Sequence, residues 1–375
     1  MRNIIDKEYY NAQGAEFLEG NLEQQKGDGE AFTSEPPVNA LSFEYLYRSM
    51  YRCIKGVLWK DSAASFFLHG IKRTMKLERE GIKLRSSTTF TIYHPKKREI
   101  LSVSFVDRVQ QRALNDFVIY PAMTKGLIFT NFACQKKKGT DLARGYLKTA
   151  LHRAFMKHGQ DFYVLKIDIK GYYPSMSHKV VREEFRKHLD DYSYSAVDKL
   201  IRLQYEQHGE THGFNPGSQL IQIAGISVLS PLDHFIKEKL HVREYLVYMD
   251  DRILISNSKE QLQSWLTIIE TKLNEKDFSI NKKKTKITKA SDGVLFLGFR
   301  YRVTSTGKVL MHPESGKVKD DIRAIRGMKR KGCSQERLAE SFKGMTEHLS
   351  KGNAYHVIKR LIKIKEERYV HEENC

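Results

Sequence analysis

Three aspartates interrupt apolar, strand-like runs of the sequence. Asp168 lies in the run 163–169, and Asp250 and Asp251 follow the run 245–248 after one methionine. Burying a carboxylate in such a run is costly unless a cation neutralises its charge. Carboxylate oxygens suit Mg²⁺, and two divalent ions about 3.5–4 Å apart stabilise both the attacking and the leaving oxygen of an in-line phosphoryl transfer. We therefore expect the three aspartates to meet around two Mg²⁺ ions.

A solvated turn would explain Asp250 and Asp251 if the pair stood alone. However, Asp168 is flanked by isoleucines and followed by two adjacent tyrosines, and Asp250 comes 82 positions later in the tetrad Tyr-Met-Asp-Asp. Helical patterns lie between the two runs. This combination favours a shared site over an isolated turn.

The surrounding residues predict the elements that position these carboxylates. Period-two alternation over 89–94 and 99–103 predicts a hairpin with a cationic tip. Apolar residues at helical spacing predict helices over 41–60 and 62–81, and amphipathic helices close the chain. Strands interleaved with helices, followed by a mostly helical end, indicate an α/β core with a helical appendix.

Composition narrows the class of protein. The 375 residues suffice for two or three substructures, and a hydrophobic content of 40% excludes wholesale disorder. A net charge of +19 indicates a nucleic-acid partner, with a merely solvated basic surface as the alternative. No apolar stretch approaches the roughly 18–20 residues that span a bilayer. Four cysteines without a Cys-x-x-Cys pair exclude a zinc ribbon and suit a reducing cytosol. We expect a cytoplasmic protein without a membrane partner.

The first residues differ in charge from the rest. Residues 1–38 hold eight acidic against three basic side chains and end near a proline pair. We expect an acidic leader over 1–40, either as a disordered tail or folded back over a basic groove.

In this order, the motifs resemble a prokaryotic reverse transcriptase, and the resemblance runs from about residue 41 to residue 361. It implies an α+β, right-hand polymerase fold with fingers over 41–160, a ferredoxin-like palm over 161–303 and a helical thumb over 304–375. It also implies that Asp168, Asp250 and Asp251, with the backbone carbonyl of Ile169, hold two Mg²⁺ ions, for which Mn²⁺ is an alternative.

The resemblance assigns further residues to the nucleotide. Lys96 and Arg98 on the hairpin tip would hold the triphosphate, and Gly217 and Gln222 resemble the family's nucleotide-pocket helix. Tyr173, five residues after Asp168, would leave no room for a ribose 2′-OH and so favour deoxynucleotides; a core aromatic is the alternative. The last assignment is Lys284, as general acid for the departing pyrophosphate, although three neighbouring lysines compete for that role.

Other motifs are similar to those that contact template and primer. The segment that contains Arg108 and Gln111 resembles the part of the family's fingers that contacts the template. The segment that contains Lys137 and Gly139 resembles the template-contacting loop that follows it. The run 296–299 resembles the primer-grip hairpin, which implies template or primer contact at Phe296 and Gly298; a core strand is the alternative. The basic helix over 317–331 would contact the template–primer duplex. A solvated basic helix without a nucleic-acid contact is the alternative.

Some positions bear on the subgroup. In the reverse transcriptases of diversity-generating retroelements, a serine precedes Gln222, but here Ile221 replaces it. Val247 occupies a position where those reverse transcriptases often have an arginine. Arg252 occupies one where they usually have an apolar or aromatic residue. Defence-associated bacterial reverse transcriptases vary more at these positions, which favours that assignment and keeps the retroelement as the alternative.

The resemblance therefore implies an RNA-directed DNA polymerase that makes cDNA in an antiviral defence system. Its partners would be a structured non-coding RNA as template, dNTPs and the DNA product, with an accessory protein or a second copy as further candidates. The rivals are a non-catalytic RNA-binding scaffold with this fold and an RNA-directed RNA polymerase. Retention of a like-charged carboxylate cluster argues against the scaffold.

Overall fold

The computed structural model describes residues 39–83, 85, 87–92, 98–206, 209–214 and 218–366, all within the unit Val38–Cys375. The expected acidic leader lies outside these residues except for its last two positions, and so do Lys96 and Gly217. In the described part of the chain, none of the helices combines the length and the apolar character needed to span a bilayer.

The first elements are three helices and an antiparallel hairpin: α2 (Phe43–Ile54), α3 (Asp61–Leu68), α4 (Gly70–Glu80), β1 (Thr88–Ile92) and β2 (Arg98–Ser102). The helical stretch expected over 62–81 is present but forms two helices, because the chain breaks at His69. After the break, Gly70 packs against Met50 of α2 so closely that a Cβ would lie 2.8 Å from the methionine sulfur. The helix expected over 41–60 ends at Ile54, just before Gly56 adopts a φ of +73°.

Four helical segments lead from the hairpin toward the central sheet: α5 (Phe105–Leu114), the π-helical turn η1 (Asn115–Ile119), α6 (Tyr120–Thr124) and α7 (Thr140–His158). The start of α5 is fixed by Ser104, whose hydroxyl oxygen accepts a hydrogen bond from the Asp107 backbone N–H at 3.1 Å.

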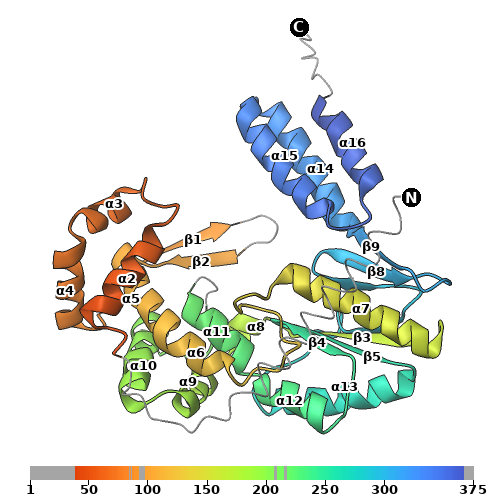
Figure 1. Cartoon of the computed structure of the whole chain (residues 1–375), viewed down its shortest axis with the longest axis horizontal. Helices are drawn as coiled ribbons and strands as arrows, with labels where there is room; N and C mark the ends of the chain where they lie inside the picture. Colours follow the sequence, from red (N-terminus) through yellow and green to blue (C-terminus); the bar gives the residue numbers. More distant parts are fainter. Residues whose placement is uncertain are drawn as a thin grey trace. The chain divides into compact units, whose positions relative to one another are not determined.

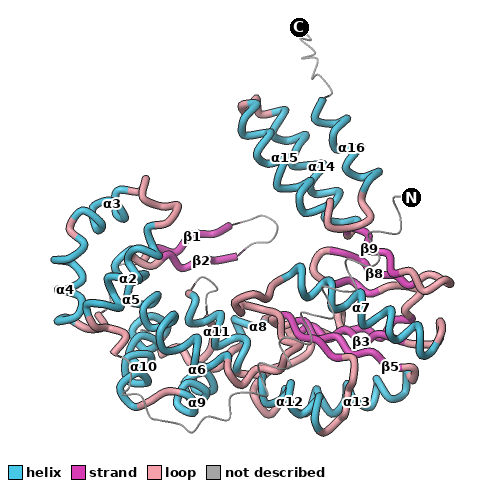
Figure 2. The backbone as a smooth tube through the Cα atoms, in the orientation of Figure 1, coloured by secondary structure: helices cyan, strands magenta, loops and turns pink. Residues whose placement is uncertain are grey.

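The central sheet is antiparallel and has the strand order β4-β5-β3-β6. Its strands are β3 (Tyr163–Asp168), β4 (Tyr245–Tyr248), β5 (Asp251–Ser256) and β6 (Lys286–Lys289). Strands β3 and β5 run side by side along their whole length (Figure 2), and their register places Asp168 opposite Asp251.

Both faces of this sheet are buried, because alternate residues of each strand enter different cores. Leu165 and Ile167 face a large core, and Val164 and Ile253 face a second core that includes α7. In Figure 1, α7 covers one face of the sheet while α12 (Ser230–Glu238) and α13 (Lys259–Asn274) lie on the other. The remaining helices of this region are α8 (Tyr172–Ser175), α9 (His178–His188), α10 (Asp191–Tyr205) and α11 (Gln219–Ser227).

A second antiparallel sheet and three helices complete the described chain. The sheet has the order β7-β8-β9, with β7 (Val294–Phe296), β8 (Phe299–Val303) and β9 (Val309–Pro313). The helices α14 (Ser315–Arg330), α15 (Gln335–Leu349) and α16 (Tyr355–Glu366) pack around a third, separate apolar core.

Candidate active site

The sheet register brings the predicted carboxylates together. Asp168 ends β3 and is paired with Asp251 at the start of β5. Residues directly opposite each other in an antiparallel pair point to the same face, so these two side chains face each other. Asp250 lies in the two-residue turn between β4 and β5, where Met249 adopts a φ of +57°. This tight turn places all three carboxylates at one end of the sheet.

The environment of these carboxylates opposes their charge. Burial raises the pKa of Asp250, and the nearby Asp168 carboxylate raises it further. Burial also raises the pKa of Asp251, although Lys166 counteracts that shift. The Lys166 ammonium lies 2.9 Å from Asp251, and the Lys284 ammonium lies 3.1 Å from Asp168. Two lysines therefore supply positive charge to this cluster.

Lys166 is a site residue that the motifs did not identify. It lies two positions before Asp168 on β3, so both side chains point to the same face of the sheet. The sequence could have identified Lys166, because residues two positions apart in a predicted strand lie on the same face.

The segment after α13 holds the end of β3 in place. The Asn281 backbone N–H donates to the carbonyl of Asp168 at 2.7 Å, and the Asp168 N–H donates to the Thr285 hydroxyl at 3.2 Å. Ile169 forms a bridge with Ile280. Lys284 thus reaches Asp168 from a turn that is itself bonded to the strand.

The donor set fits a divalent cation in its chemistry. One buried and two half-buried carboxylates offer the hard oxygen ligands that Mg²⁺ takes. The raised pKa values of Asp250 and Asp251 show that their negative charge is unfavourable without a nearby cation. The described residues contain no group of three or more Asp, Glu, His or Cys side chains already arranged around one metal position.

A buried ion pair lies on the opposite face of β5. Arg252 alternates with Asp251 and enters the large core, where its Nε lies 3.1 Å from Oδ1 of Asp233 on α12. The Tyr245 hydroxyl donates to the same oxygen at 2.6 Å. The sequence signal was an arginine within an apolar run, which requires an acidic partner when buried.

Tyr173 lies between the carboxylates and α11. Its hydroxyl is buried without a hydrogen-bond partner in the described structure, and a Cβ at Gly225 would lie 3.1 Å from that oxygen. The neighbouring Tyr172 donates to the Gly225 carbonyl, which fixes α8 against α11. Tyr173 thus packs against the core, where burial raises its pKa, and the Asp250 carboxylate adds to that shift.

The other predicted nucleotide contacts are placed only in part. Gln222 is half-buried on α11, and Arg98 begins β2, although its side chain is outside the described atoms. Lys96 and Gly217 are outside the described residues.

Arg108 and Gln111 on α5 line a cavity of about 570 Å³ beside β2 and the start of α11. The Gln111 side-chain nitrogen is buried and has no hydrogen-bond partner among the described residues. Their helix neighbour Asp107 points elsewhere, because it pairs with Arg85 at 2.7 Å. Asp107 therefore holds α5 to Arg85, whereas Arg108 and Gln111 of the same helix line the cavity.

The loop before α7 is held by a lysine that the motifs did not single out. Lys138 donates to the carbonyls of Phe129 at 2.8 Å and Asn131 at 3.0 Å, and burial lowers its pKa to about 8. Lys137 is exposed with a φ of +59°, and Gly139 precedes the first residue of α7. The loop presents Lys137 outward because Lys138 fixes it from inside.

The expected template or primer contact at Phe296 is wrong for its side chain. Phe296 is fully buried in the second core, as is Phe299, since β7 and β8 turn their aromatic faces inward. Gly298 has a φ of +82° in the turn between them, and a Cβ there would lie 3.1 Å from the His348 ring. The run shapes the turn and packs it against α15.

The chain was compared with protein families, curated proteins and solved structures. Residues 95–301, more than half of the chain, match the family described as reverse transcriptase (RNA-dependent DNA polymerase). No curated protein matches the chain. Among solved structures, it is similar to telomerase from Candida albicans in complex with a fragment of telomeric RNA, with a TM-score of 0.45 and 12% identity. That similarity covers 82% of this chain and 64% of the telomerase chain.

The family match accounts for the mixed helices and strands and confirms the expected α+β, right-hand polymerase fold. The chain belongs to the reverse transcriptase (RNA-dependent DNA polymerase) family.

Proposed function

We propose that this reverse transcriptase extends a priming 3′-hydroxyl with deoxynucleotides on an RNA template. The observation that carries the proposal is the pairing of Asp168 with Asp251 at the end of β3 and β5, with Asp250 in the adjoining turn. As part of this proposal, residues 41–160 are the fingers, 161–303 the palm and 304–375 the thumb.

Divalent ions are the natural partners of this cluster. Asp168, Asp250 and Asp251, with the carbonyl of Ile169, would hold two Mg²⁺ ions or, as a substitute, Mn²⁺. When bound, the ions would neutralise charge on the attacking and leaving oxygens. Lys166 and Lys284 balance the carboxylates before the ions enter, since each contacts one of them.

The chain's own side chains have distinct roles in the proposed reaction. Lys284, anchored beside Asp168 by the turn at Asn281, would donate a proton to the departing pyrophosphate. The ring of Tyr173, backed by α11, would exclude a ribose 2′-hydroxyl.

The cavity beside α5 suits the single-stranded template. Lys55, Lys60 and Arg108 line it, and no acidic partner contacts these three side chains in the described residues. Free cations attract phosphates, and the orphan amide of Gln111 offers a hydrogen-bond donor to a base or sugar. Replacing Lys55 and Lys60 by Ala should weaken RNA binding and reduce its salt dependence by about 0.7 per lost phosphate contact on a log–log plot. An unchanged slope would place the template elsewhere.

The biological setting is also a proposal. Ile221, Val247 and Arg252 depart from the retroelement pattern, which supports a cytoplasmic antiviral defence role with a structured non-coding RNA. Sequencing the RNA and DNA that co-purify with the protein tests this. One recurrent structured RNA supports it, whereas variable-repeat transcripts would favour the diversity-generating retroelement.

Primer extension tests the activity. Poly(rA) primed with oligo(dT) should support dTTP incorporation with Mg²⁺, whereas omission of the divalent ion should abolish it. Failure to extend on RNA, together with retained RNA binding, would favour the non-catalytic scaffold. Preference for UTP over dTTP would favour an RNA polymerase.

A further inference from the structure

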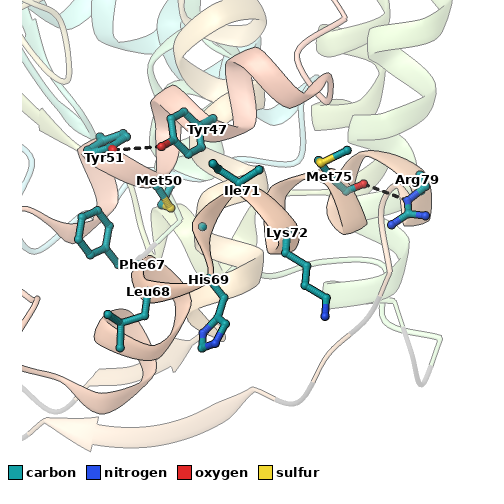
Figure 3. Close-up of a pocket in the computed structure, with 11 residues that line it drawn as sticks. Tyr47, Met50, Tyr51, Phe67, Leu68, His69, Ile71, Lys72, Met75 and Arg79 are labelled. Atoms are coloured by element: carbon teal, nitrogen blue, oxygen red, sulfur yellow. Dashed lines mark hydrogen bonds between the residues drawn. The ribbon is translucent and has the colours of Figure 1, made fainter.

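An apolar groove of about 610 Å³ lies between α2 and α4, far from the carboxylates in sequence (Figure 3). Met50 and Tyr47 of α2 line one side, and Ile71 and Met75 of α4 line the other. The close approach of Gly70 to Met50 fixes the two helices against each other, so the groove is built into the fold.

Exposed apolar side chains concentrate around this groove. Four of the eleven large hydrophobic side chains that are exposed in the described residues line it. Leu68 is 77% exposed, Ile71 59% and Met75 48%. Clustered exposure of this kind marks an interaction surface rather than ordinary solvated positions.

The aromatic side chains of the groove pack against one another. Tyr47 packs edge-on against Tyr51 at 5.2 Å between ring centroids, and Tyr51 packs edge-on against Phe67 at 5.8 Å. The most exposed surface is therefore aliphatic. Nucleic-acid bases bind by stacking on free aromatic faces, so this surface suits apolar side chains of a protein better than bases.

The charges at the groove have one sign. Lys72 and Arg79 line it together with His69, and among the described residues that line it none is acidic. Lys72 forms no ion pair within the described chain, and Arg79 donates only to the Met75 carbonyl, at 3.4 Å. Glu78 of the same helix turns away and accepts from the Phe43 backbone N–H. The groove therefore complements an acidic partner.

The groove is separate from the proposed template cavity. Tyr47, Met50 and Tyr51 of α2 line the groove, whereas Arg52 and Lys55 of the same helix line the cavity. The two sites share no lining residue, so occupation of one leaves the other open.

From these observations we propose that the groove binds an amphipathic helix of another protein, with acidic residues beside its apolar face. Two antiparallel helices with an apolar cleft between them are a usual receptor for such a helix. Methionines at positions 50 and 75 let the cleft adapt to the inserted side chains. The partner's glutamates or aspartates pair with Lys72 and Arg79.

The test uses a fluorescein-labelled synthetic peptide of about 18 residues, longer than the about 12–15 below which isolated helices are marginal. Leucines at helical spacing form one face and glutamates the other. Fluorescence anisotropy measures its affinity for the full-length protein. Ile71→Glu and Lys72→Glu should each weaken binding by about tenfold or more. Both residues are exposed, and primer extension should be unchanged in both variants.

Lys76→Glu is the matched control, because Lys76 is on the same helix but does not line the groove. It should bind the peptide like the wild type. A peptide with lysines in place of glutamates should bind the wild type weakly and gain affinity for the Lys72→Glu, Arg79→Glu double variant.

Several outcomes would overturn the proposal. Equal losses in the Lys72 and Lys76 variants would mean unspecific charge attraction. Competition by oligo(rU), weakened by the same groove variants, would make RNA the occupant. Concentration-dependent dimerisation that Ile71→Glu abolishes would make a second copy the occupant. Each result is independent of whether the protein extends primers.

Discussion

Arg252 and Asp233 form an ion pair, each residue 1% exposed, on the face of β5 opposite Asp251. Burial raises the pKa of Asp233 and opposes its charge, while the guanidinium of Arg252 counteracts this shift. Because Arg252 is the next residue after Asp251, the pair fixes the strand that carries a proposed metal ligand. At this position β5 is held to α12 by the ion pair of Arg252 with Asp233, where an apolar side chain would be usual.

Removing one member of this pair should destabilise the protein strongly. Arg252→Met leaves Asp233 buried and uncompensated, which should lower the free energy of unfolding by about 3–5 kcal/mol in urea titrations. Replacing both residues by Leu should cost much less. Arg48→Met is the matched control, because its pair with Glu44 is exposed and should contribute less than about 1 kcal/mol. Similar losses for Arg48→Met and Arg252→Met would contradict this account.

The sequence predicted the meeting of the carboxylates because the signals are local. Short apolar runs identified the strands, and the Tyr-Met-Asp-Asp tetrad marked the turn between two of them. The partner of Arg252 could not be predicted, because Asp233 is on a helix whose packing depends on the whole core. The break between α3 and α4 was missed for the same reason, since it depends on the contact of Gly70 with Met50.

The burial of Phe296 shows another limit of motif reasoning. A motif locates a segment along the chain, but it does not say which side chains of that segment face inward. Here β7 places Phe296 in the core, and only the second sheet's position reveals this. The same limit applied to Lys137 and Lys138, of which only the second is held by backbone carbonyls.

Tyr173 should select the sugar through its ring. Tyr173→Ala should lower the preference for dNTPs over rNTPs by about 10–200-fold, the range of a hydrophobic pocket contact. Tyr173→Phe should retain it, because the hydroxyl has no hydrogen-bond partner in the described structure. Single-nucleotide incorporation kinetics measure both ratios. Equal discrimination by the Ala variant and the wild type would remove Tyr173 from this role.

Lys284 should affect the chemical step rather than RNA affinity. Lys284→Ala should lower the single-turnover rate by about a hundredfold or more, the usual range for a general acid. Lys283→Ala is the matched control, since that lysine is exposed in the same turn. If the two variants lose the same activity, the positive turn as a whole is responsible, and Lys284 has no specific role.

Divalent ions should stabilise the protein through the carboxylates. The raised pKa values of Asp250 and Asp251 mean that the folded protein holds protons there more tightly than the unfolded chain. Without divalent ions, stability should therefore fall as the pH rises above the ordinary carboxyl pKa of about 4. Mg²⁺ at about tenfold above its Kd should restore about 1.4 kcal/mol at neutral pH.

Thermal unfolding with and without Mg²⁺ measures this effect. Asp250→Asn should be more stable than the wild type in the metal-free state and should gain less from Mg²⁺. An equal Mg²⁺ shift in both proteins would place the ion elsewhere.

The most direct measurement is dTTP incorporation on primed poly(rA) by Asp168→Asn and by the Asp250→Ala, Asp251→Ala double variant. Asp161→Asn is the matched control, because Asp161 is an exposed carboxylate just before β3. Both site variants should keep their fold and RNA affinity but lose about a thousandfold or more in rate, while the control stays active. Synthesis by either site variant at the wild-type rate would show that these carboxylates do not perform the reaction.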